Sequence, residues 1–281
     1  TMLTDRAERL PVKVVGAEEW GMLQSTAPFW FDPNSAGKNE VPVDATGRFV
    51  AAIDAQLAQS DSKDVFIYVH GYKVAYENPL LISSELWHFL GYDGAFIAYA
   101  WPSTPSKFAY IKDSDTSAGY SRNLRLLIET IAKKTKAERI NIIGYSNGTR
   151  LVLRAMEQLS FIHQGESAEK IQQELGIGNV ILVGSDVDRG VFREYVADGL
   201  LNVSQRLTIY LSANDKALGI SQFLTRRQRL GQMWDLSSNK LTPAIRKALE
   251  KNRDKINFID VSLVEGVSSG NGHGYFQSSP S

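Results

Sequence analysis

The chain has 281 residues, no cysteine, and 31 lysine and arginine residues against 31 aspartate and glutamate residues, so its formal net charge is zero. This balance provides no basic field for nucleic acid or an anionic membrane, and the lack of cysteine excludes disulfides, thiolate nucleophiles and cysteine–zinc sites. No apolar run approaches the roughly 20 residues that a membrane span needs, and the charged first residues contain no signal-peptide core. The sequence is compatible with a cytoplasmic protein and with an exported one that has lost a leader.

The N-terminal segment, 1–46, is predicted to be irregular apart from one short strand. The apolar run at 12–15 predicts that strand, and the residues after it are rich in aromatic residues, proline and glycine. Regular structure follows. Apolar positions at helical spacing predict a helix at 49–57, and apolar runs rich in β-branched and aromatic residues predict strands at 65–69 and 95–101.

Strands and helices continue to alternate in the rest of the chain. The pattern predicts a helix at 118–135, a strand at 140–145, a helix from about 148 to 159, and strands at 179–184, 207–212 and 256–264. A polar insertion, 216–255, separates the last two strands and contains a helix start at Thr242-Pro243, an N-cap followed by proline at the first helical position. This insertion and the aromatic stretch 29–31 are predicted to border a pocket.

These elements predict the fold class. The strands are apolar almost throughout, as expected for a mainly parallel sheet with helices on both faces, and the alternation of strand and helix is typical of α/β proteins. No internal repeat or low-complexity linker divides the chain. We therefore expect a single domain over 1–281, with 216–255 as a small cap between the last two strands.

A serine lies at one of the strand-to-helix junctions, in the stretch Gly144-Tyr145-Ser146-Asn147-Gly148. Glycine two residues before and after a serine is weak evidence alone, but between a strand and a helix it is the pattern of a nucleophile elbow. The glycines relieve crowding around a strained serine, and the helix N-terminus favours a developing anion. Ser146 is therefore the predicted nucleophile.

A serine hydroxyl needs a base to take its proton, and a histidine is the usual base. His70 ends a predicted strand, His88 lies in a helical pattern, and His163 follows the helix after the serine. His273 lies in a glycine- and serine-rich loop just after the last strand. Such a loop can bring an imidazole over a nucleophile, so we predict His273 as the base.

Two strand ends offer the acid that holds the tautomer of the base. Asp215 follows the strand directly before the one that leads to His273, whereas Asp186 and Asp188 follow the strand after that of the nucleophile. Open α/β sheets keep their site residues at such strand ends. Because a helical pattern follows Asp186 and Asp188 and either can serve as its N-cap, we favour Asp215 and keep the other two as alternatives.

An oxyanion hole requires two backbone N–H donors. The first is predicted at Asn147, directly after the nucleophile. The second is predicted at Tyr72, in a loop where Gly71 allows the backbone a close approach. His70 is then a structural residue that shapes this loop.

Six motifs resemble those of a bacterial α/β-hydrolase family of unassigned function that is related to esterases and lipases. In chain order they are His70-Gly71-Tyr72, Trp101-Pro102-Ser103, the elbow around Ser146, Ser185-Asp186-Val187-Asp188, Ser212-x-Asn214-Asp215 and His273-x-Tyr275-Phe276. The resemblance extends across most of the chain. It implies an α/β-hydrolase fold with Ser146, Asp215 and His273 as a catalytic triad.

These residues predict a serine hydrolase, most specifically a carboxylesterase for small to medium acyl esters that needs no metal or cofactor. A thioesterase, lipase, amidase or acyltransferase would use the same residues. A non-catalytic binding protein on the same scaffold is the alternative from another class. The sequence has neither a Walker lysine pattern nor a Gly-x-Gly-x-x-Gly turn after its first strands, which argues against a nucleotide-binding protein.

Overall fold

The computed structural model describes residues 14–23, 44–71, 77–102, 110–232 and 243–263. Helices and strands alternate along these ranges, with two short 3₁₀ turns. In chain order they are α1 (Ala45–Ala58), β1 (Asp64–Val69), α2 (Glu77–Phe89), β2 (Ala95–Tyr99), α3 (Tyr110–Lys134), β3 (Arg139–Tyr145), α4 (Gly148–Ile162), α5 (Ala168–Leu175), β4 (Ile177–Val183), α6 (Arg189–Ala197), η4 (Leu200–Asn202), β5 (Arg206–Leu211), α7 (Lys216–Thr225), α8 (Pro243–Lys251), η5 (Arg253–Lys255) and β6 (Ile256–Asp260).

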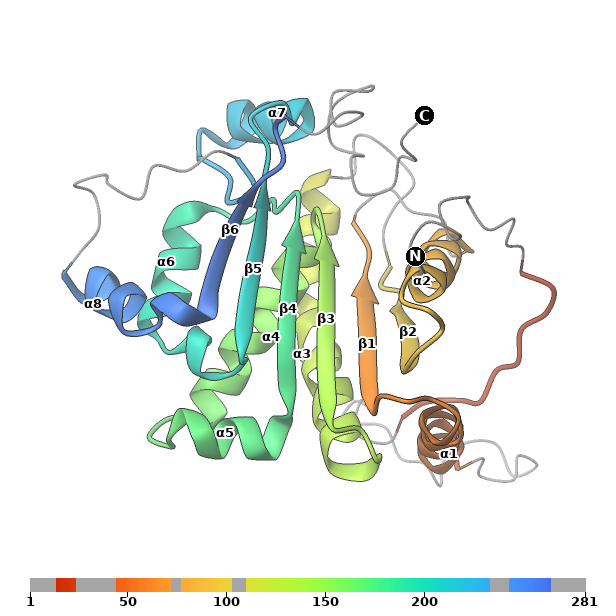
Figure 1. The fold of residues 1–281 in the computed structure, drawn as a ribbon. Coiled ribbons are helices and arrows are strands. Elements are labelled where there is room, and N and C mark those ends of the chain that lie inside the picture. Colours follow the sequence, from red (N-terminus) through yellow and green to blue (C-terminus); the bar gives the residue numbers. More distant parts are fainter. Residues whose placement is uncertain (1–13, 24–43, 72–76, 103–109, 233–242, 264–281) are drawn as a thin grey trace, which may run out of the picture.

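The six strands form one parallel sheet in the order β2-β1-β3-β4-β5-β6 (Figure 1). β3, which carries Ser146 at its end, lies inside the sheet between β1 and β4. Because all the strands are parallel, their carboxyl ends share one edge, and the loops after β1, β3, β4 and β5 leave the sheet side by side. The sheet thereby confirms the predicted fold class and places Ser146, Asp186, Asp188 and Asp215 at one edge.

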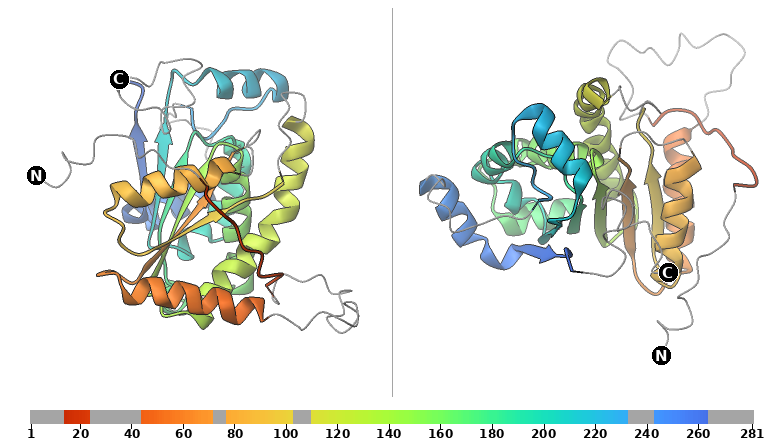
Figure 2. Two further views of the ribbon diagram at one scale, coloured as in Figure 1. Left: turned by 90° about the vertical axis from the view of Figure 1, so that its right-hand side faces the viewer. Right: turned by 90° about the horizontal axis from the view of Figure 1, so that it is seen from above.

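Alternate residues of each strand pack on opposite faces of the sheet. On one face, Ile67, Ile142 and Leu182 belong to a large core that also contains side chains of α3, α4 and α6. On the other face, Tyr68, Ile143, Tyr145 and Val183 form a smaller cluster against α2, through Ile82 and Leu86. Figure 2 shows the helices on both sides of the sheet. Burial on both faces explains why these strands read as continuous apolar runs.

The apolar residues of α4 pack against the sheet, as their helical spacing in the sequence predicts. The apolar stripe recognised in the sequence is fully buried, at Leu151, Val152, Ala155, Met156 and Leu159. This stripe holds the helix against the sheet directly behind the nucleophile turn. The orientation of α4, and with it the direction of its N-terminus, is therefore set by the core rather than by solvent-exposed contacts.

The structure corrects two details of the sequence prediction. Val14 and Val15 are exposed and form no strand, so the run at 12–15 has no strand partner in its described part. β6 ends at Asp260, four residues before the predicted end. Within the insertion 216–255, α7 lies at the carboxyl-end edge of the sheet, whereas α8 packs beside α6 (Figure 1).

Several predicted features lie outside the described residues, namely 12–13, the aromatic stretch 29–31, Tyr72, Thr242 and His273. Within the described ranges, no helix combines the length and apolarity that a bilayer crossing requires.

Candidate active site

Ser146 has a left-handed backbone conformation, with φ of 52°. A residue with a Cβ atom adopts this conformation only at a cost of about 1–2 kcal/mol, and such strain concentrates at functional sites. Hydrogen bonds hold the turn: the Ser146 N–H donates to the carbonyl of Val183 at 2.9 Å, and the Thr149 N–H and hydroxyl donate to the Ser146 carbonyl at 3.1 and 2.6 Å. Ser185 donates in turn to the Thr149 hydroxyl at 3.0 Å. The strained conformation is thus fixed from β4 and from the first turn of α4.

Glycines make room for this turn, as the sequence predicted. A Cβ atom at Gly148 would lie 2.3 Å from the carbonyl oxygen of His70, and one at Gly144 would lie 3.0 Å from Val152. A third glycine lies in the loop after the neighbouring strand β1: a Cβ atom at Gly71 would lie 2.9 Å from Cβ of Ser146. The backbone after β1 therefore lies directly against the serine.

The predicted oxyanion-hole residue Asn147 is the N-cap residue of α4 and is fully buried. Its side chain makes no capping hydrogen bond to the first turn of the helix. The start of α4 thus remains uncapped by this side chain and presents the positive end of the helix dipole beside the serine.

His70 is locked into the loop after β1. The Trp101 backbone N–H donates to its Nε2 at 3.1 Å, and its Nδ1 lies 2.6 Å from the Gly71 carbonyl oxygen. The Trp101 indole donates to the His70 carbonyl at 2.8 Å and stacks on the imidazole, with ring centroids 5.3 Å apart. Burial lowers the pKa of His70 from 6.5, partly opposed by its backbone hydrogen bonds. These contacts suit a neutral residue that shapes the loop.

Asp215 and Asp188 occupy equivalent local positions after neighbouring strands. Each is an N-cap residue: Asp215 accepts from the Leu218 N–H at 3.0 Å at the start of α7, and Asp188 accepts from the Val191 N–H at 3.1 Å at the start of α6. Helix capping therefore does not distinguish a bystander from a catalytic acid here. Asp215 is the more buried of the two.

The loop that contains Asp215 is joined to the end of β6. The Ala213 N–H donates to the Ser262 hydroxyl at 2.8 Å, and the Asn214 side-chain amide donates to the Ser262 carbonyl at 2.8 Å. The chain that continues towards His273 therefore starts beside the Asp215 loop.

Asp186 is held by a buried network that the sequence did not predict. Its carboxylate accepts from the Ser221 hydroxyl at 2.6 Å and lies 3.3 Å from Arg150 and 3.4 Å from Arg229. Both arginines also donate to its backbone carbonyl. Two cations and a hydroxyl therefore surround this carboxylate. No local pattern identifies these partners, because they come from α4, α7 and a loop.

Residues 228–232 pass across the carboxyl ends of β4 and β5, and we call them the crossing segment. It forms backbone hydrogen bonds with the loops after both strands, among them Leu230 N–H to Val187 O at 2.8 Å and Ser212 N–H to Gly231 O at 2.9 Å. A Cβ atom at Gly231 would lie 2.5 Å from the Ser185 nitrogen. Part of the predicted cap is thus closely packed on this edge.

The structure thereby brings Ser146, Asn147 and Gly71 together, and places Asp186, Asp188 and Asp215 at the same edge of the sheet. The other described histidines lie elsewhere. His88, on α2, contacts the Tyr92 hydroxyl at 2.7 Å, and His163 follows the last residue of α4, at the end remote from Ser146.

The parallel sheet and its strained serine turn define an α/β-hydrolase. A family model described as "Alpha/beta hydrolase of unknown function (DUF900)" matches residues 46–281, and the chain belongs to this family. A search of the curated proteins finds no match.

Solved structures with some similarity include an iodinated complex of acetyl xylan esterase, with a TM-score of 0.37, 10% identity, and coverage of 75% of this chain and 90% of that chain. Another is Thermogutta terrifontis esterase 2 phosphoramylated by tabun, with a TM-score of 0.38, 14% identity, and coverage of 77% and 78%. The fold assignment depends on the sheet topology and the family.

Proposed function

We propose that this protein is a serine hydrolase, a carboxylesterase that cleaves small to medium acyl esters through an acyl-enzyme on Ser146. The observation that carries the proposal is the left-handed conformation of Ser146 between β3 and α4. A serine in an ordinary turn requires neither a strained backbone nor closely packed glycines at positions 71, 144 and 148. A nucleophilic serine requires both, because its hydroxyl has to project away from the neighbouring backbone.

In the proposed mechanism, Ser146 Oγ attacks the acyl carbonyl while His273 takes its proton. His273 then passes this proton to the leaving alcohol, and a water molecule releases the acyl group by the reverse sequence. The backbone N–H groups of Asn147 and Tyr72 stabilise the oxyanion. Asp215 orients the imidazole, a role supported by the hydrogen bonds between its loop and the end of β6.

The proposal is tested by labelling the full chain with a fluorescent fluorophosphonate and by assaying hydrolysis of nitrophenyl butyrate. Ser146→Ala and His273→Ala should lose both signals, whereas His88→Ala should keep them. Ser146→Gly is a sharper variant, because glycine accepts positive φ without strain. It should unfold at a higher temperature than the wild type and still be inactive, which separates loss of the nucleophile from loss of the fold.

Stoichiometric labelling of the Ser146 variants at another residue would show that the nucleophile is wrongly assigned. An unlabelled wild type without esterase activity would favour the non-catalytic alternative.

A further inference from the structure

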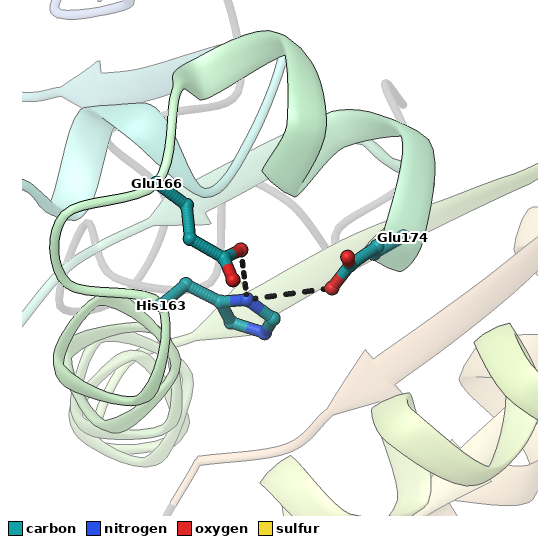
Figure 3. A group of neighbouring side chains, drawn as sticks. All are labelled: His163, Glu166 and Glu174. Carbon is teal, nitrogen blue, oxygen red and sulfur yellow. Dashed lines mark hydrogen bonds and ion pairs between the residues drawn. The ribbon is translucent and has the colours of Figure 1, made fainter.

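The carboxyl end of α4 and the helix that follows it carry a cluster of ionisable side chains far from Ser146. Within the described ranges, His163, Glu166 and Glu174 form the one group of histidine and carboxylate ligand atoms that converge closely enough to hold a metal ion, all within 4.8 Å of one another. Figure 3 shows both carboxylates directed at the same imidazole edge. The length of α4, about 22 Å for 15 residues, separates this cluster from the serine.

One nitrogen of the imidazole faces two carboxylates. His163 Nδ1 lies 2.9 Å from Oε2 of Glu166 and 3.6 Å from Oε2 of Glu174. This nitrogen can give at most one proton, so it cannot form good hydrogen bonds to two carboxylates at once. A tetrahedral zinc ion with ligand bonds near 2.0–2.1 Å places its ligand atoms about 3.3 Å apart. The two observed distances lie on either side of that value.

Lys170 binds the opposite oxygens of the same carboxylates. Its Nζ lies 2.9 Å from Oε1 of Glu166 and 3.7 Å from Oε1 of Glu174. Each glutamate thus uses one oxygen for the lysine and presents the other to the histidine. The lysine neutralises only one of the two negative charges, so the carboxylates retain a net charge of −1 for a cation.

We propose that His163, Glu166 and Glu174 form a zinc site that joins the end of α4 to α5. One nitrogen and two carboxylate oxygens suit Zn²⁺, whereas Mg²⁺ and Ca²⁺ prefer oxygen ligands alone. The imidazole side chain is only 10% exposed, which holds the nitrogen in place, while Glu174 is 44% exposed and leaves access for water as a fourth ligand. On binding, Zn²⁺ takes the Nδ1 lone pair: in a neutral ring the proton moves to Nε2, and an imidazolium loses its Nδ1 proton to solvent.

This zinc site does not depend on the proposed esterase activity, and its test does not use that activity. The full chain is stripped with EDTA, dialysed and titrated with Zn²⁺ by calorimetry, while its melting temperature is followed with and without the metal. We expect one Zn²⁺ per chain and a higher melting temperature on binding, because the ligands converge only in the folded state.

Glu174→Gln is the test variant, because it removes one ligand charge from a half-exposed side chain and preserves its size. It should weaken zinc binding roughly tenfold or more, and His163→Gln should abolish the thermal shift. Glu138→Gln is the matched control: it removes one exposed carboxylate elsewhere and should bind zinc as the wild type does. The proposal is wrong if the wild type binds no zinc, or if Glu174→Gln and Glu138→Gln bind it equally well.

Discussion

The strain at Ser146 is maintained by its neighbours and not by the serine itself. An isolated serine would relax from φ of 52° towards the ordinary helical or extended regions. Here the hydrogen bonds to the Val183 carbonyl and from Thr149 hold the turn, and Gly71 and Gly148 let the adjoining backbones close around it. The packing of α4 against the sheet offsets the free-energy cost of this conformation.

The assignment of the acid can be tested by a matched pair of substitutions, Asp215→Asn and Asp188→Asn. Asparagine caps helices about as well as aspartate, so each variant should retain its helix cap and unfold near the wild-type temperature. An asparagine beside the catalytic histidine favours the wrong tautomer, with a loss of roughly 10⁴ in turnover as precedent. We therefore expect Asp215→Asn to lose esterase turnover by this order and Asp188→Asn to keep it.

The measurement is kcat for nitrophenyl butyrate together with thermal unfolding of both variants. If Asp188→Asn alone loses turnover, the triad is Ser146, Asp188 and His273. Because Asp186 is bound by two arginines and Ser221, Asp186→Asn should act mainly on stability.

At the scale of elements, one buried ion pair attaches the crossing segment to the loop after β4. Arg229, on this segment, and Asp186, after β4, are both almost fully buried. Arg189 strengthens the same attachment: its guanidinium donates to the Arg229 carbonyl at 3.0 Å and to the Gln232 carbonyl at 2.9 Å. The edge that holds the candidate site is therefore stabilised by charged side chains that are shielded from solvent and interact with protein groups.

Arg229→Met should destabilise the protein by about 3 kcal/mol, because it leaves a buried carboxylate short of a partner. The free energy of unfolding in urea measures this loss. Arg227→Met is the control in the same part of the chain: Arg227 is 65% exposed and lies 3.9 Å from Asp188, so its loss should change stability by less than about 0.5 kcal/mol.

A double-mutant cycle isolates the pair itself. The combined variant Asp186→Asn/Arg229→Met should cost less than the sum of the two single variants, with a coupling of about 0.5–3 kcal/mol. Strict additivity would show that the two side chains act independently.

At the scale of the whole molecule, the stability should depend on pH through His70. Burial lowers the pKa of this residue in the folded state, whereas in the unfolded chain it returns to about 6.5. Below about pH 6.5, His70 binds a proton more readily in the unfolded chain than in the folded protein. Stability is therefore retained above about pH 6.5 and decreases as the pH falls from there towards the folded-state pKa.

The free energy of unfolding measured between about pH 7 and pH 5 tests this linkage, with a slope of at most about 1.4 kcal/mol per pH unit from one group. His70→Gln should have a lower stability at neutral pH and a shallower dependence on pH in this range. His88→Gln, on α2, is the control for a histidine substitution away from the β1 loop. Equal slopes for the wild type and His70→Gln would contradict the assignment.

Local sequence patterns determined much of this protein. Every strand that the structure describes overlaps a predicted run, because burial on both faces forces continuous apolar residues at those positions. The turn at Ser146 was equally visible, since a strand end, two glycines and an amphipathic stripe are properties of adjacent residues. The pattern failed at Val14 and Val15, where an apolar run has no strand to pair with.

Only the tertiary structure decided which distant groups meet. The order of the strands places the Gly71 backbone against Ser146, and the fold brings Arg150 and Arg229 to Asp186. Likewise, α4 and α5 bring His163 and Glu174 together. Asp186, Asp188 and Asp215 are each an aspartate after a strand in the sequence, yet one becomes an ion-pair centre and two become helix caps. Hydrophobic periodicity and turn formation depend on residues that are close in sequence. The partner of a buried charge depends on which distant segments the folded chain brings into contact with it.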